Sequence, residues 1–272
     1  MEQHDLRNWK EFEEQITLLE GCRTRRKTET SLHVSPLLFR GQSDASWRLT
    51  TTLERVTAKP VTLRQYYRAI SGAKSQIEVF TGTQWDVPSL PEYESWLSSE
   101  RTLTPGKFPG YEYMVYLRHH GFPSPLLDWS SSPYVAAYFA FAHARTSNER
   151  VAIFAYWEYP GSGKLWSASQ PHIHGLGPYV RGHKRHFLQR SEYTVCLVFD
   201  QVHRYGPHEE AFATGEEQQD LLWKFTLPAT ERVEVLRLLD RYNLNAFSLF
   251  GSEESLMETL ALREVVFREA EL

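Results

Sequence analysis

A short segment has the order aromatic residue, arginine, glycine, glutamine: Phe39-Arg40-Gly41-Gln42 follows two leucines and is predicted to end a buried strand. A guanidinium at the end of a strand holds phosphate oxygens by two parallel, charge-assisted hydrogen bonds. Gly41 would let the backbone approach a ligand closely. The structural alternative is that Arg40 simply forms an ion pair with Asp44 or Asp128.

Three consecutive serines form a second candidate group. Ser130, Ser131 and Ser132 follow Trp129 and precede a proline at position 133, which is typical of the first turn of a helix. Hydroxyl groups at this point can orient a ligand or neighbouring side chains by hydrogen bonds. The alternative is that the serines only form the polar start of that helix.

A carboxylate follows a strongly basic run. Residues 181–190 contain four Lys or Arg residues and two histidines, and Glu192 follows after one further residue, Ser191. A placed carboxylate stabilises a positive charge that develops in a reaction, typically by a few kcal/mol. The basic run, with Phe187 and Tyr193, suits phosphate attraction and base stacking. A solvated loop and a solvent-facing Glu192 are the alternatives.

The composition is that of an ordinary globular chain. The 272 residues carry a formal net charge of −4, with 41% hydrophobic and 24% charged residues, and the mean hydropathy is −0.47. The negative charge argues against a protein that coats nucleic acid non-specifically. The longest apolar stretch, residues 134–142, is well short of the ~18 residues that span a bilayer, and the polar N-terminus predicts no secretory signal.

Cysteine and histidine usage points to a reducing compartment and to no metal. Cys22 and Cys196 are the two cysteines of the chain, as expected for a cytoplasmic protein. The close histidine pairs 172/174 and 183/186 have neither a cysteine partner nor a His-Glu-x-x-His helix, so we expect no metal site.

Apolar periodicity predicts the elements that position these residues. The order is helices and short strands first, then mostly strands and terminal helices, which indicates an α+β fold with one compact core. Helices are expected over residues 1–22, 62–80, 111–120, 133–144, 231–242 and 255–267, and strands over 37–41, from 126, and over 151–157, 193–199 and 222–227. Residues 23–27 are predicted as an exposed basic turn and 81–110 as an irregular connection.

Three segments together resemble the FRG-domain family. They are the Phe-Arg-Gly-Gln-Ser segment at 39–43 with Trp-Arg-Leu at 47–49, the run His-His-Gly-Phe-Pro-Ser-Pro-Leu-Leu-Asp-Trp-Ser at 119–130, and residues 185–194. Ser248-Leu249-Phe250 occupies the place of a further family segment near the end. The resemblance implies an FRG / ADP-ribosyltransferase-like domain over 37–272, preceded by a helical segment over 1–36.

The same segments are similar to the Arg-Ser-Glu pattern of ADP-ribosyltransferases. This resemblance implies a split mixed sheet flanked by helices, with Arg40, Ser130 and Glu192 as catalytic residues and NAD as substrate. Glu253 and Glu254 remain alternatives for the carboxylate. The implied NAD-binding residues are Arg40, Gly41, Gln42, Trp129, Ser130, Ser131, Ser132, Tyr134 and Gln189.

The function implied is a mono-ADP-ribosyltransferase toxin of a bacterial toxin–antitoxin or antiphage system, with a neutralising antitoxin protein as partner. Single-stranded RNA is the preferred acceptor, since its bases are already unstacked. The residues expected to bind it are Arg181, Lys184, Arg185, Arg190 and Tyr193. NAD hydrolysis, protein ADP-ribosylation, a non-catalytic nucleic-acid-binding module and a metal-dependent nuclease using Asp128 and Glu192 are the alternatives.

Overall fold

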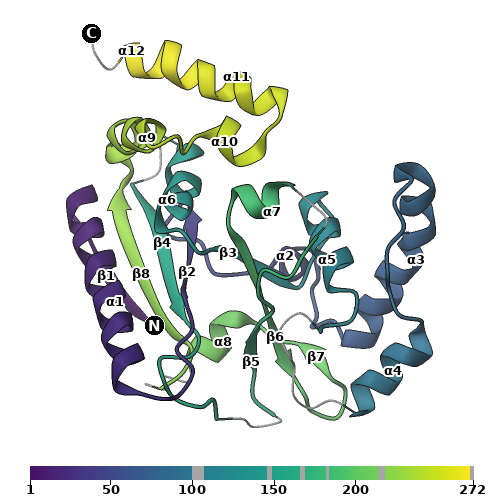
Figure 1. Cartoon of the computed structure of the whole chain (residues 1–272). Coiled ribbons are helices and arrows are strands. Elements are labelled where there is room, and N and C mark those ends of the chain that lie inside the picture. Colours follow the sequence, from purple (N-terminus) through teal and green to yellow (C-terminus); the bar gives the residue numbers. More distant parts are fainter. Residues whose placement is uncertain (100–106, 146–148, 166–168, 182–183, 214–217, 270–272) are drawn as a thin grey trace.

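The fold is built around one mixed sheet. A computed structural model of the chain describes residues 1–99, 107–145, 149–165, 169–181, 184–213 and 218–269. The strand order is β1-β8-β4-β2-β3-β6-β5, and β7 pairs with β6 (Figure 1). The strands are β1 (Glu2–Asp5), β2 (Leu37–Gln42), β3 (Leu126–Ser130), β4 (Arg150–Trp157), β5 (His172–Gly175), β6 (Ser191–Val198), β7 (Arg204–Tyr205) and β8 (Leu221–Pro228).

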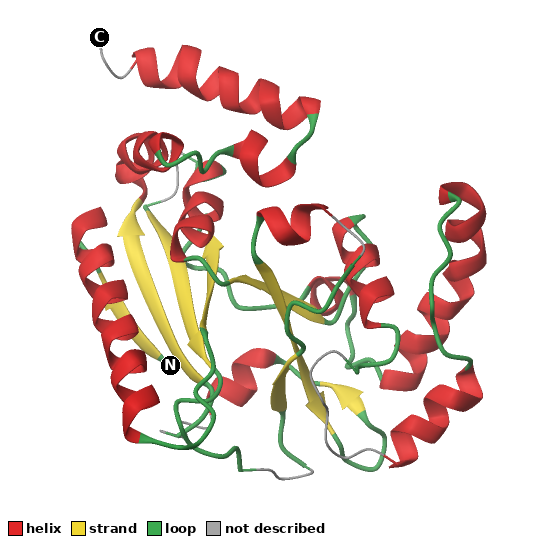
Figure 2. Cartoon of the chain, in the orientation of Figure 1, coloured by secondary structure: helices red, strands yellow, loops and turns green. Residues whose placement is uncertain are grey.

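Helices cover the sheet and fill the connections (Figure 2). They are α1 (Trp9–Glu29), α2 (Thr52–Val56), α3 (Leu63–Thr81), α4 (Leu90–Ser99), α5 (Tyr111–His119), α6 (Pro133–Ala142), α7 (Lys184–Leu188), α8 (His208–Ala213), α9 (Arg232–Arg241), α10 (Ala246–Phe250), α11 (Glu253–Ala261) and α12 (Phe267–Glu269). A short 3₁₀ turn, η1 (Ala229–Glu231), precedes α9, and a π-helical turn, η2 (Leu262–Val266), joins α11 to α12.

The sheet divides between β2 and β3. β2 pairs with β4 at every position from Leu37 to Gln42, and β3 pairs with β6 at every position from Leu126 to Ser130. Between β2 and β3, however, the register has a single pair, Phe39 with Ser130. The two halves therefore separate at the strand ends, as the left and right halves of the sheet in Figure 1 do.

Each half of the sheet has its own core. On β1-β8-β4-β2, apolar side chains of α1, α6 and α9 pack against one face, with Phe12, Phe141 and Phe225 fully buried. The other half packs against α3, α4 and α5 through a tyrosine-rich cluster. A third cluster lies under α8, on the face that carries Trp129 and Tyr156. Burial of these side chains is the main source of stability.

The α+β class, with a mixed sheet flanked by helices, is confirmed. The helices predicted over 62–80, 111–120 and 231–242 are also confirmed. α6 begins at its proline as expected. Among the residues that the structure describes, no helix is long and apolar enough to cross a bilayer.

Two predictions near the N-terminus are wrong. Residues 2–5 form strand β1, which pairs in parallel with β8, so the helix begins only at Trp9. Asn8 sets this boundary because its side chain accepts a hydrogen bond from the backbone N–H of Glu11. The expected basic turn at residues 23–27 is instead the end of α1. The segment 1–36 thus contributes both an edge strand and a core helix.

The connection over 81–110 is more regular than predicted, since it contains α4. Ser89 and Glu92 explain the start of that helix. The Ser89 backbone N–H and hydroxyl both donate to the Glu92 carboxylate, which is half of a capping box. Residues 100–106, which follow α4, lie outside the described part of the chain.

Candidate functional site

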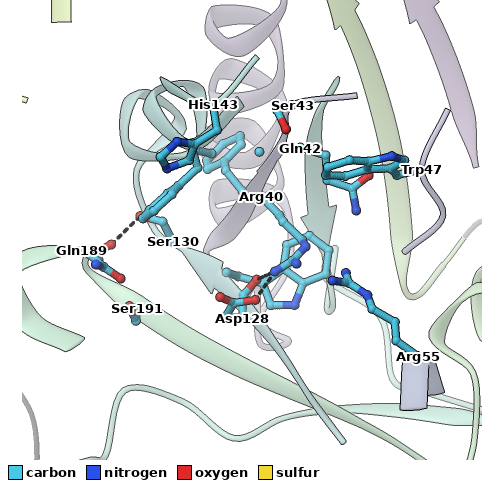
Figure 3. Close-up of a pocket in the computed structure, with 15 residues that line it drawn as sticks. Arg40, Gln42, Ser43, Trp47, Arg55, Asp128, Ser130, His143, Gln189 and Ser191 are labelled. Atoms are coloured by element: carbon cyan, nitrogen blue, oxygen red, sulfur yellow. Dashed lines mark hydrogen bonds and ion pairs between the residues drawn. The ribbon is translucent and has the colours of Figure 1, made fainter. Parts of the chain in front are cut away.

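A pocket of about 260 Å³ opens where the sheet divides (Figure 3). Its walls come from the ends of β2 and β3, from α6, from the start of β6 with the turn before it, and from α2 with the loop that joins it to β2. In Figure 3, Arg40 and Asp128 lie at its centre. The lining residues are Phe39, Arg40, Gly41, Gln42, Ser43, Trp47, Arg55, Asp128, Trp129, Ser130, Ala136, Phe139, His143, Gln189 and Ser191.

Two arginines share the carboxylate at the centre of the pocket. Arg40 Nη1 donates to both the backbone and the side-chain oxygen of Asp128, and Arg118 of α5 donates to the same side-chain oxygen. Burial opposes ionisation of Asp128, but the two guanidinium groups outweigh it and hold the pKa of the carboxyl well below its usual range. The ion-pair alternative for Arg40 is thus confirmed with Asp128, whereas Asp44 accepts hydrogen bonds from Ser46.

Trp47 and Arg55 line the pocket although the sequence assigned neither to the site. Arg55 hydrogen-bonds to Thr50 and forms no ion pair with any carboxylate that the structure describes, so its charge is available to an anion. Trp47 is 52% exposed. A tryptophan a few residues after Phe39-Arg40-Gly41 is a signal that could have found Trp47. Nothing in the sequence distinguishes Arg55 from other arginines.

Gln42, which the sequence did assign, lines the pocket and is buried. Its Nε2 donates to the backbone carbonyl of Arg48 at 3.2 Å. Within the described residues its Oε1 has no hydrogen-bond partner, and neither has Nε of Arg40. Two buried polar atoms of the pocket are therefore unsatisfied, which is rare in folded proteins.

Gly41 lies against α6 as well as the pocket. A Cβ at this position would lie 1.9 Å from the backbone oxygen of Ala136 and 2.6 Å from the backbone nitrogen of Ala140. The close approach that the sequence suggested for a ligand is therefore made by a helix, and the missing side chain lets β2 pack directly on α6.

The three serines have different environments. Ser130 lines the pocket, and its hydroxyl donates to the Gln189 carbonyl at 2.7 Å while accepting from the Ser132 backbone N–H. Ser132 caps α6 by accepting from the Val135 N–H, as the structural alternative predicted. Ser131 donates its backbone N–H to the Arg190 carbonyl and does not line the pocket. Only Ser130 is thus placed to meet a ligand there.

Of the two aromatic residues expected to bind NAD, Trp129 lines the pocket and Tyr134 does not. The indole N–H of Trp129 donates to Thr194. Tyr134 lies outside the pocket lining; its ring contacts Trp9 at a centroid distance of 6.2 Å. Gln189 lines the pocket, with its side-chain amide donating to the Leu249 carbonyl.

Glu192 does not line the pocket. It pairs with Trp129 in the β3–β6 register, whereas Ser191 pairs with Ser130. Side chains alternate across a sheet, so Glu192 lies on the face opposite Ser130 and Ser191. Burial, together with the charge of Glu158, raises the pKa of the Glu192 carboxyl. Within the described residues no hydrogen bond or ion pair joins Glu192 to Arg40, and the alternatives Glu253 and Glu254 in α11 are not in the lining either.

The expected RNA-binding residues fall into two groups. Arg181, Lys184 and Arg190 are exposed. Arg185 lies over the Phe250 ring, 5.4 Å from its centroid. These four cations and Phe187, which is 63% exposed, form a surface beside Gln189 that we call the basic lip. Residues 182–183 lie outside the described part of the chain.

Tyr193 is not part of this lip, because its side chain is completely buried. Its hydroxyl pairs with His119, and its ring stacks on His186. Base stacking on Tyr193 is therefore excluded by packing.

The fold and the site define an α+β domain whose ligand-sized pocket opens at a split in the sheet. Residues 35–149 match the family model described as FRG domain, and the chain contains an FRG domain over this region. The matched region holds most of the pocket, from Phe39 to His143, but ends before Gln189 and Ser191. No curated protein and no solved structure matches the chain.

Proposed function

We propose that the pocket binds NAD and that the chain transfers ADP-ribose from it to RNA. The observation that carries this proposal is the charge balance of the pocket. Arg40 and Arg118 share the single carboxylate of Asp128, and Arg55 adds a cation with no described acidic partner, so these four groups sum to about two positive charges at neutral pH. A diphosphate carries the opposite charge, and guanidinium groups are well suited to its oxygens.

In this proposal Asp128, not Glu192, is the carboxylate at the reacting centre. The bond between C1′ of the nicotinamide ribose and the ring nitrogen of nicotinamide breaks, and nicotinamide leaves with the electron pair. The acceptor forms the new bond to C1′ and loses a proton. Asp128 stabilises the positive charge that develops at C1′, and its low pKa keeps it ionised for this role. Ser130 hydrogen-bonds to the ribose.

RNA as acceptor is supported by the basic lip, defined by Arg181, Lys184, Arg185, Phe187 and Arg190. The lip adjoins Gln189 at the edge of the pocket. Exposed cations next to an exposed aromatic ring attract phosphates and stack on unpaired bases. In this proposal, expression of the chain is toxic to the cell, and an antitoxin protein neutralises the chain.

Two isosteric variants test the carboxylate. The full chain is incubated with NAD labelled in its adenylate half and with RNA, DNA and protein. We expect label on RNA, and we expect Asp128→Asn to lower kcat by roughly 100-fold, as loss of one electrostatic stabiliser typically does, with NAD still bound. Glu192→Gln serves as the matched control and is expected to change kcat by no more than about threefold.

Each outcome has a distinct meaning. Nicotinamide release without a labelled acceptor would assign the pocket to NAD hydrolysis. Absence of release by the unaltered chain, with RNA binding retained, would favour a non-catalytic module. Loss of turnover in Glu192→Gln but not in Asp128→Asn would return the carboxylate role to Glu192. Thermal unfolding of Asp128→Asn checks that the variant is folded.

A further inference from the structure

The pocket has two chemically different ends. In Figure 3, Trp47, Gln42 and Arg55 lie on one side of the Arg40–Asp128 pair, and Ser130, Gln189 and His143 lie on the other. The second end adjoins the basic lip. The first end is formed by β2, by the loop that follows it and by Arg55 of α2. Arg55 belongs to the proposed phosphate site, whereas Trp47 and Gln42 have no role in the proposed chemistry.

At this first end, a buried acceptor lies next to an exposed ring. The Gln42 side chain is bonded to the carbonyl of Arg48, the residue after Trp47. A carbonyl only accepts hydrogen bonds, so the amide must turn its NH₂ group to Arg48 and leave Oε1 as the unsatisfied atom. Trp47, 52% exposed, supplies a flat surface beside it.

We infer that this end is a subsite for an adenine ring, which stacks on the Trp47 indole while Gln42 Oε1 accepts a hydrogen bond from its 6-amino group. The inference rests on the proposed binding of NAD and names the residues that select its base. Stacking holds any base. The amino group satisfies an oxygen that is otherwise buried without a partner, and such an acceptor discriminates strongly against a ligand that lacks the donor.

NAD has a second NH₂ group, on its nicotinamide, but the layout of the pocket places that ring elsewhere. The reacting ribose must lie near the carboxylate and near the acceptor, which enters by the basic lip beside Gln189. Nicotinamide therefore takes the Ser130 end. Arg55, at the Trp47 end of the pocket, is then well placed for the diphosphate that joins the two halves.

Ligand analogues test the subsite on the unaltered full chain by titration calorimetry. The analogue with hypoxanthine in place of adenine carries an oxygen instead of the 6-amino group. We expect it to bind about tenfold more weakly than NAD, the effect of one hydrogen bond to a buried group. The analogue with nicotinic acid in place of nicotinamide keeps the 6-amino group of adenine. We therefore expect it to show no loss of affinity that depends on Gln42.

Two variants identify the residues. Gln42→Met has a similar volume and no acceptor, so it should bind NAD and the hypoxanthine analogue equally. Trp47→Ala should weaken both by the same factor of about tenfold, and its ring is exposed enough for the fold to tolerate the change.

The failure of this inference is distinguishable from that of the proposed function. If the unaltered chain does not bind NAD, the proposed function itself fails. If NAD binds and the hypoxanthine analogue binds equally well, only the adenine subsite is overturned. Discrimination against the nicotinic acid analogue that disappears in Gln42→Met would also overturn it, because Gln42 would then face the other ring.

Discussion

At the scale of single residues, the contact between β2 and α6 depends on Gly41. Replacement by alanine would put a methyl carbon within 1.9 Å of the Ala136 backbone oxygen, and backbone atoms of a helix cannot move aside as a flexible side chain can. We expect Gly41→Ala to lower the free energy of unfolding by about 3 kcal/mol or more, as overpacking of a tight core does. Urea unfolding measures this change.

Gly72 provides the matched control. It lies within α3, and a Cβ there would have no heavy atom within 4 Å. Because alanine is the better helix former, Gly72→Ala should raise the free energy of unfolding by about 0.5–1 kcal/mol. Equal effects at the two positions would contradict the packing role of Gly41.

The sequence located part of the site and missed the rest for identifiable reasons. Arg40, Gln42, Ser130 and Gln189 all line the pocket, since the ends of β2 and β3 meet the turn before β6 there. Glu192 was harder to place because a shift of one residue in strand register moves a side chain to the other face. That register is set by pairing with β3, which residue type does not reveal.

At the scale of elements, α7 carries two cations of the basic lip, Lys184 and Arg185, which can be removed without touching the pocket lining. We expect the double variant Lys184→Ala/Arg185→Ala to lower RNA labelling by about tenfold at low salt, since each lost phosphate contact weakens binding. Nicotinamide release without RNA should stay unchanged. Gel analysis of labelled RNA measures the first quantity and chromatography of nicotinamide the second.

A pair of exposed cations on α1, Arg25 and Lys27, supplies the control, because their removal changes the net charge by the same amount. Arg25→Ala/Lys27→Ala should leave RNA labelling as it is. If both double variants reduced labelling alike, the effect would come from overall charge and the basic lip would not be the acceptor site.

Elements with a clear apolar period were predictable, and elements defined by caps were less so. α3 and α5 follow from apolar spacing of three and four residues. α4 was missed because its Pro- and Ser-rich surroundings suggested a loop, although Ser89 followed three residues later by Glu92 is a capping signature. The last turns of α1 have no apolar side to detect, since residues 24–29 are exposed.

At the scale of the whole molecule, two buried histidines make stability depend on pH. Burial lowers the pKa of both His174 and His208 to about 3, with nearby cations adding to the effect. The ordinary value is 6.5, so unfolding takes up protons between about pH 6.5 and 3. We expect stability to fall on acidification through this range by up to about 1.4 kcal/mol per pH unit for each histidine.

Urea unfolding at pH 7 and pH 5 measures this loss, and His208→Gln isolates one contribution. His208 is completely buried and hydrogen-bonds to Thr194, a contact that glutamine can replace without titrating. The variant should lose less stability between the two pH values than the unaltered chain. An identical loss in both would show that His208 already titrates normally when folded.

The parallel pairing of β1 with β8 has a consequence for synthesis of the chain. Glu2 pairs with Trp223, so during synthesis β1 meets its neighbour only after more than 200 further residues have been made. At ~5–20 residues per second this delay is roughly 10 to 40 s. During it β1 is an unpaired strand, the kind of segment that nucleates aggregation. Its four residues are Glu, Gln, His and Asp, and their polarity suits a strand that must wait in solution for its partner.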